Sequence, residues 1–74
     1  MSERSPIETW REAERCSIEQ LAKASGLLAQ DIKHIEAGET GIPGELQDYL
    51  TKRGVNVSQM ASEQSAFIAS LRQR

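Results

Sequence analysis

The amino-acid sequence predicts an all-α fold in which five helices form one compact domain over residues 1–74. Three observations lead to this prediction. Apolar residues recur at helical spacing, capping signatures precede several of the apolar segments, and glycines follow several of them. The chain has room for one core, because a domain of this size buries only about 60% of the surface of its unfolded chain.

The first two helices are predicted from their N-terminal caps. The segment Ser5-Pro6-Ile7-Glu8 combines a serine cap with proline at the first helical position. Helical spacing then predicts that one apolar face of this helix is formed by Ile7, Trp10 and Ala13. The segment Ser17-Ile18-Glu19-Gln20 has the pattern of a capping box, so a second helix begins there. We expect it to end near Ser25, because Gly26 can adopt the left-handed conformation.

The third helix is predicted over about residues 29–37, after a turn of three residues. Gly38 is available to end this helix, and its inward positions are Ile32 and Ile35. Leu28 occupies the expected cap position and offers no side-chain oxygen, although Asp31 in the first turn suits the helix dipole.

Two further helices complete the prediction. The fourth begins at Pro43 and ends before Gly54, and its apolar positions are Leu46, Tyr49 and Leu50. Asn56 caps a fifth helix over about residues 57–72, whose apolar stripe comprises Met60, Phe67, Ile68 and Leu71. This stripe either covers the core of its own chain or pairs with the same helix of a second chain. We favour a homodimer, because a domain this small gains from dimerisation.

Composition argues against several classes of protein. A single cysteine, Cys16, makes a disulfide within the chain impossible, and a single histidine, His34, makes a zinc site improbable. No set of residues has the pattern of a catalytic triad, so we expect neither an enzyme nor a bound cofactor or metal, and no small-molecule ligand is implied. The sequence has no signal-peptide pattern and no run of roughly 20 apolar residues, which predicts a cytoplasmic protein that does not cross a membrane.

The segment of residues 17–38 has the spacing of a helix-turn-helix. The small, turn-forming and apolar positions that such a motif requires are occupied by Leu21, Ala22, Gly26, Leu27, Ile32 and Ile35. This spacing places Gln30, Lys33 and His34 on the outer face of the third helix, where they could enter a major groove or simply form a solvated face.

Through "SIEQLAKASGLLAQDIKHIEAG", the following loop and Pro43, the chain resembles the Cro and phage-repressor family of regulators, also called XRE-type. The resemblance implies a lambda-repressor-like DNA-binding domain that acts as a transcription regulator, most simply a repressor, and binds double-stranded DNA as a dimer. It also implies contacts to bases from Ala29, Gln30, Lys33 and His34, and a position near the phosphates for Thr40. In that family a basic residue of the first helix pairs with an acidic residue that ends the third. Arg11 and Glu36 match this pair, and Arg11 could also donate to a phosphate.

Charge and several substitutions leave a second interpretation open. The net charge is −2, and residues 1–40 contain five Lys and Arg against eight Asp and Glu, whereas DNA-binding surfaces are usually basic. The loop after the third helix lacks basic residues, so phosphate anchors are missing and we expect weak binding. The alternative is a protein-interaction module on the same scaffold, with weak or no DNA binding. Its apolar contact surface would be formed by Ile18, Leu28 and Ile42.

Overall fold

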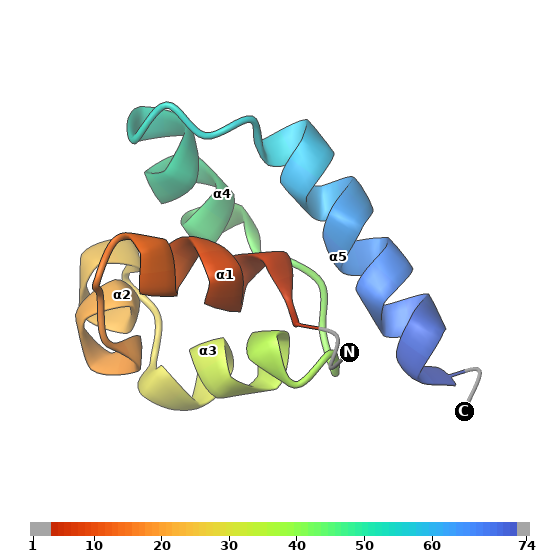
Figure 1. The fold of residues 1–74 in the computed structure, drawn as a ribbon. Coiled ribbons are helices and arrows are strands. Elements are labelled where there is room, and N and C mark those ends of the chain that lie inside the picture. The colour runs from red at the N-terminus through yellow and green to blue at the C-terminus, as the bar shows by residue number, and fades with distance from the viewer. Residues whose placement is uncertain (1–3, 73–74) are drawn as a thin grey trace.

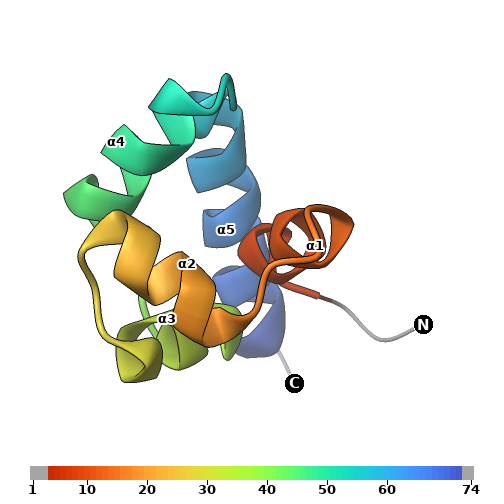
Figure 2. The ribbon, with the colours of Figure 1, turned by 90° about the vertical axis from the view of Figure 1, so that its left-hand side faces the viewer.

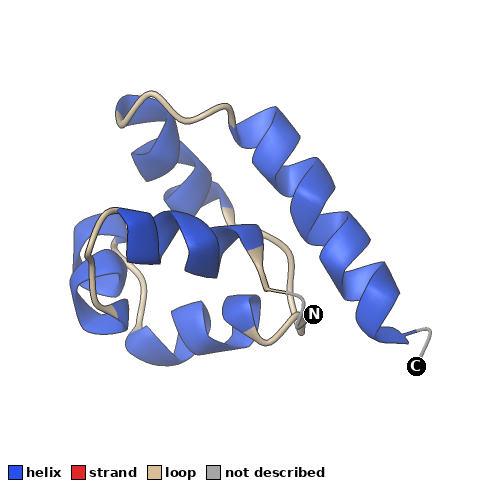
Figure 3. Cartoon of the chain, viewed as in Figure 1, coloured by secondary structure: helices blue, strands red, loops and turns tan. Residues whose placement is uncertain are grey.

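The computed structural model describes residues 4–72, and within them it contains five α-helices and no strand (Figure 3). The helices are α1 (Pro6–Ala13), α2 (Ile18–Ser25), α3 (Ala29–Glu36), α4 (Gly44–Lys52) and α5 (Val57–Arg72). Their Cα atoms have a radius of gyration of 11.5 Å. The predicted compact all-α fold is therefore confirmed, and the chain ends of the predicted domain, residues 1–3 and 73–74, lie outside the described residues.

The predicted caps form at the starts of α1 and α2. Ser5 Oγ accepts a hydrogen bond from the backbone N–H of Ile7 at 3.2 Å. At α2, Ser17 Oγ accepts from the N–H of Gln20 at 3.1 Å, and Gln20 Oε1 accepts in return from the N–H of Ser17 at 2.8 Å. Each bond provides a partner for an amide that has none inside its helix. Local sequence therefore determines where both helices begin.

Two helix boundaries differ from the prediction by one residue, and one residue of a predicted apolar face is exposed. Helix α3 ends at Glu36, so Ala37 is its C-cap. Helix α4 begins at Gly44, because Pro43 is extended with ψ of 158° and serves as the N-cap. Ala13, which helical spacing places on the apolar face of α1, is exposed in the last turn of that helix.

The core lies between the first four helices and is closed by α5. Helices α2 and α3 pack closely, while α5 packs on α1 and α4 and lies on the opposite side of the bundle from α2 (Figures 1 and 2). The buried apolar side chains come from every helix and from the loop before α4: Ile7, Leu21, Ala22, Ile32, Ile35, Ile42, Leu46, Leu50 and Met60. Burial of such side chains supplies most of the free energy that stabilises a helical domain.

The apolar stripe of α5 packs against its own chain. Met60 is only 7% exposed. Gly38, which has φ of +78°, faces the other end of the stripe: a Cβ atom there would overlap Leu71 Cδ1 and would lie 3.0 Å from Phe67 Cε2. Glycine at this position therefore permits the close approach of α5 to the end of α3. Because the stripe is used within the chain, it gives no support to the homodimer, which stays a prediction.

No helix among residues 4–72 combines the length and the apolar character needed to cross a membrane.

Candidate nucleic-acid interface

Helix α3 is held against α2 by a short turn with defined geometry. Gly26 has φ of +79°, in the left-handed region, and the N–H of Leu27 donates to the carbonyl of Ala22 at 2.8 Å. Ala22 is 3% exposed and Leu21 is fully buried, so α2 presents a closely packed face to α3. Since Ile32 and Ile35 fill the inner side of α3, the opposite side of this helix faces solvent.

The residues predicted to contact bases lie on this outer side. Gln30 and Lys33 are exposed, and Ala29 and His34 are half-buried. Thr40, predicted to lie near phosphates, is exposed in the loop that follows α3. The structure thus brings the side chains of Gln30, Lys33 and His34 together on one helix face, with Ala29 in the first turn.

His34 is held between two neighbours, Gln30 and Glu39, and the contact with Glu39 was not predicted from the sequence. Its Nε2 lies 3.4 Å from Gln30 Nε2, and its Nδ1 lies 3.1 Å from Glu39 Oε1. In a neutral imidazole, an Nδ1–H would donate to the carboxylate and Nε2 would accept from the amide. The Glu39 side chain is 57% exposed, so it places a negative charge at the edge of the candidate interface.

Arg11 and Glu36 form a bidentate pair between α1 and the end of α3. Arg11 Nε donates to Glu36 Oε2 at 2.7 Å and Nη2 donates to Oε1 at 3.2 Å. Nη1 donates to the carbonyl of Cys16 at 2.9 Å. The hydrogen bond to Glu36 raises the pKa of Arg11 above its ordinary value. The Arg11 side chain is 14% exposed and three of its five N–H groups have partners, so Arg11 joins α1 to the end of α3, and its contact with a phosphate stays a prediction.

A buried polar network joins α5 to the end of α3 and was not predicted. Gln64 is 1% exposed, and its Nε2 donates to the carbonyls of Ile35 at 2.8 Å and Thr40 at 3.0 Å. Gln64 Oε1 accepts from Ser5 Oγ at 2.8 Å. The network therefore connects the N-cap of α1, the last turn of α3 and the loop that carries Thr40. A sequence signal existed, because Gln64 lies within the apolar stripe of α5, where a polar residue is costly unless it has partners.

The apolar contact surface expected for a protein-interaction module, formed by Ile18, Leu28 and Ile42, is only partly exposed. Leu28 is 69% exposed and is the only large apolar side chain among the described residues to be so exposed. Ile18 is half-buried. Ile42 is buried at 9% exposure, so its assignment to a contact surface is wrong: the loop turns it inward between α3 and α4, where it joins the core.

The described residues hold no cluster of three or more His, Cys, Asp or Glu that could bind a metal ion. Cys16 is a free, half-buried thiol that packs against the core.

No protein-family model, no curated protein and no solved structure matches this chain. The similarity to the Cro and phage-repressor family therefore stays a resemblance, carried by residues 17–38, the following loop and Pro43.

Proposed function

We propose that this chain is a small transcriptional regulator that binds double-stranded DNA through the outer face of α3 and acts as a repressor. In this proposal α2 and α3 form a helix-turn-helix, and α3 is its recognition helix. The supporting observation is the arrangement of α3: Gln30 and Lys33 project into solvent one turn apart, while Ile32 and Ile35 anchor the opposite face. A helix held in this way can enter a major groove without disturbing the core.

Each outward side chain has a chemical role in the proposal. The amide of Gln30 can make paired hydrogen bonds to N6 and N7 of adenine. The ammonium of Lys33 can donate to the N7 and O6 atoms of guanine or to a phosphate. The Thr40 hydroxyl can donate to a phosphate, and the backbone that carries it is fixed by Gln64. Ala29 offers a methyl group that can contact thymine.

The charge of this face predicts modest affinity. Lys23 is exposed on α2 and Lys33 is exposed on α3. Two acidic residues lie near Lys33 in the sequence: Asp31 on α3 and Glu39 in the following loop. With about two phosphate contacts from lysine, the logarithm of the binding constant should fall with the logarithm of salt concentration with a slope of about −2. A repressor with a basic loop would show a steeper slope.

Fluorescence anisotropy of a labelled duplex of mixed sequence tests the proposal. The protein is titrated at low salt and across a salt series, together with Lys33→Ala, His34→Ala and the control Lys52→Ala. Lys52 is exposed on α4 and carries the same charge as Lys33, so its loss removes one charge away from α3. We expect Lys33→Ala to weaken binding several-fold and to reduce the salt slope by about 1.

Two results would overturn the proposal: absence of binding at low salt and high protein concentration, or equal weakening by Lys33→Ala and Lys52→Ala. A second candidate, the protein-interaction module with weak or no DNA binding, is favoured by the exposed Leu28 and by the contact of His34 with Glu39. That candidate predicts no saturable DNA binding and unchanged anisotropy in every variant.

A further inference from the structure

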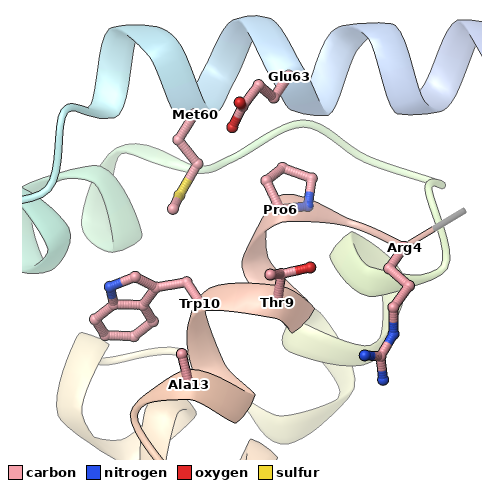
Figure 4. A pocket seen from close by; sticks show the side chains of 7 residues that line it. All are labelled: Arg4, Pro6, Thr9, Trp10, Ala13, Met60 and Glu63. Carbon is pink, nitrogen blue, oxygen red and sulfur yellow. The ribbon is translucent and has the colours of Figure 1, made fainter.

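A groove runs between α1 and α5 (Figure 4). Two hollows of about 530 and 290 Å³ lie along α5 and share Arg4 and Glu63, so they form one groove. It follows α5 from Met60 to Ser70, a length of about 15 Å, or roughly three helical turns, at 1.5 Å per residue. Its lining residues belong to α1, α5 and the residue Arg4, and none belongs to α3.

The floor of the groove is apolar and offers an anchoring position. Pro6 and Trp10 line it from α1, and Met60 and Phe67 line it from α5. In Figure 4 the side chain of Met60 points from α5 toward α1, on the side where the Trp10 indole lies. The Trp10 ring is held edge-on against Tyr49, with centroids 6.3 Å apart and an interplanar angle of 87°. An aromatic ring fixed beside a flexible thioether can accommodate apolar side chains of varied shape.

The charged residues at the groove are one arginine and three carboxylates: Arg4 and Glu63 line it, and Glu8 and Glu12 are the ion-pair partners of Arg4. Arg4 Nη2 lies 2.7 Å from Glu12 Oε1 and 3.5 Å from Glu8 Oε2, so two carboxylates already share its charge. Glu63 is exposed, and no ion pair within residues 4–72 includes it. Its carboxylate points from α5 toward α1, over the groove (Figure 4). A cation placed against Glu63 would therefore gain an unshared partner beside an apolar surface.

We propose that the α1–α5 groove binds a basic amphipathic helix of a partner protein. An apolar side chain of that helix lies between Trp10 and Met60, and a lysine or arginine one or two turns along pairs with Glu63. A duplex is disfavoured at this site because the carboxylates repel phosphates. A second copy of this chain is also disfavoured, because none of the five helices carries a net positive charge. The groove adds a second interaction surface to the proposed DNA-binding face and does not depend on it.

Trp10 is the only tryptophan of the chain, so its fluorescence reports directly on the groove. The probes are two synthetic helical peptides of about four turns, with leucine along one face and either lysine or glutamate beside it. We expect a saturable change in Trp10 emission with the lysine peptide and none with the glutamate peptide.

Two substitutions locate the binding. Glu63→Lys should weaken the lysine peptide at least tenfold and allow the glutamate peptide to bind, since the unpaired charge changes sign. Ala13→Arg should fill the exposed end of the groove and weaken binding of the lysine peptide. The matched control is Ser65→Lys, an exposed position on the same helix that does not line the groove, and it should leave binding unchanged. Circular dichroism checks that each variant folds.

Absence of saturable binding by the lysine peptide at millimolar concentration would overturn the proposal. Binding that is equally sensitive to Glu63→Lys and Ser65→Lys, or insensitive to Glu63→Lys and Ala13→Arg, would also overturn it, because the peptide would then bind elsewhere. The same variants are also tested with duplex DNA, so that the two proposals are judged separately. Failure of the peptide assay would not count against DNA binding by α3, and failure of the DNA assay would not count against peptide binding by the groove.

Discussion

Replacing Gln64 with leucine should destabilise the protein although it makes the core more apolar. The wild-type side chain serves three polar groups at once: the hydroxyl of Ser5 and the carbonyls of Ile35 and Thr40. Leucine has a similar volume and can donate to none of them and accept from none. The substitution therefore separates the cost of unpaired polar groups from the cost of a cavity.

The size of the destabilisation depends on the hydrogen-bond partners that Ser5, Ile35 and Thr40 keep when Gln64 is replaced. Ser5 is fully buried, so its hydroxyl proton loses its partner at a cost of about 1–3 kcal/mol. The carbonyl of Ile35 still accepts from the N–H of Gly38 at 3.1 Å and loses less. Thr40 is exposed, so water can reach part of its backbone. Burial of the leucine methyl groups returns about 1 kcal/mol. We expect a net loss of about 2 kcal/mol, which lowers Tm by roughly 8–16 °C in a domain of this size.

Urea unfolding monitored by Trp10 fluorescence measures this loss. The control is Gln59→Leu, the same substitution at an exposed position of α5, which should change the free energy of unfolding by less than about 0.5 kcal/mol. In the double variant Ser5→Ala with Gln64→Leu, both partners of one bond are gone, so the combined loss should be about 1 kcal/mol smaller than the sum of the single losses. A Gln64→Leu variant with the same free energy of unfolding as the wild type would refute the reasoning. So would a loss in the double variant equal to the sum of the two single losses.

Three further predictions follow from contacts around α3. Gly38→Ala should lower the free energy of unfolding by about 3 kcal/mol, because alanine disfavours this φ and its Cβ would overlap α5. Gly26→Ala has a similar φ but open space around the Cβ, so it should cost only about 1 kcal/mol. Equal losses in urea unfolding would contradict the packing argument. Glu36→Ala should lower Tm by several degrees, because it leaves a largely buried guanidinium poorly paired, whereas Glu14→Ala, which removes an exposed pair, should leave Tm almost unchanged. An unaltered Tm in Glu36→Ala would remove the idea of a structural pair. Glu39→Gln removes a negative charge from the candidate interface and should tighten DNA binding about threefold at low salt in the anisotropy assay; no change would show that this charge lies outside the interface.

Local signals in the sequence were sufficient to predict the helices. Ser5 and Ser17 cap α1 and α2, and Gly26 ends α2 with a positive φ. These features could be predicted because each depends only on neighbours in the chain. The inward positions Ile32 and Ile35 follow from helical spacing for the same reason. Boundaries differ by one residue where Pro43 could be either a cap or a first helical residue, since both positions suit its fixed φ.

Features that depend on distant parts of the chain could not be predicted in this way. Gln64 acquires its partners from segments 24 to 59 residues away, and Ile42 is buried only because the loop turns back onto the core. The same limit applies to the candidate interface, where the sequence identified the outward residues of α3 but not Glu39 against His34. These two findings belong together physically. Gln64 fixes the carbonyls at the end of α3 and at Thr40, so the loop that carries Glu39 is held at both sides, and the position of its charge relative to α3 is set by α5. Any contact that displaced α5 would therefore release this loop and change the face that we propose for DNA.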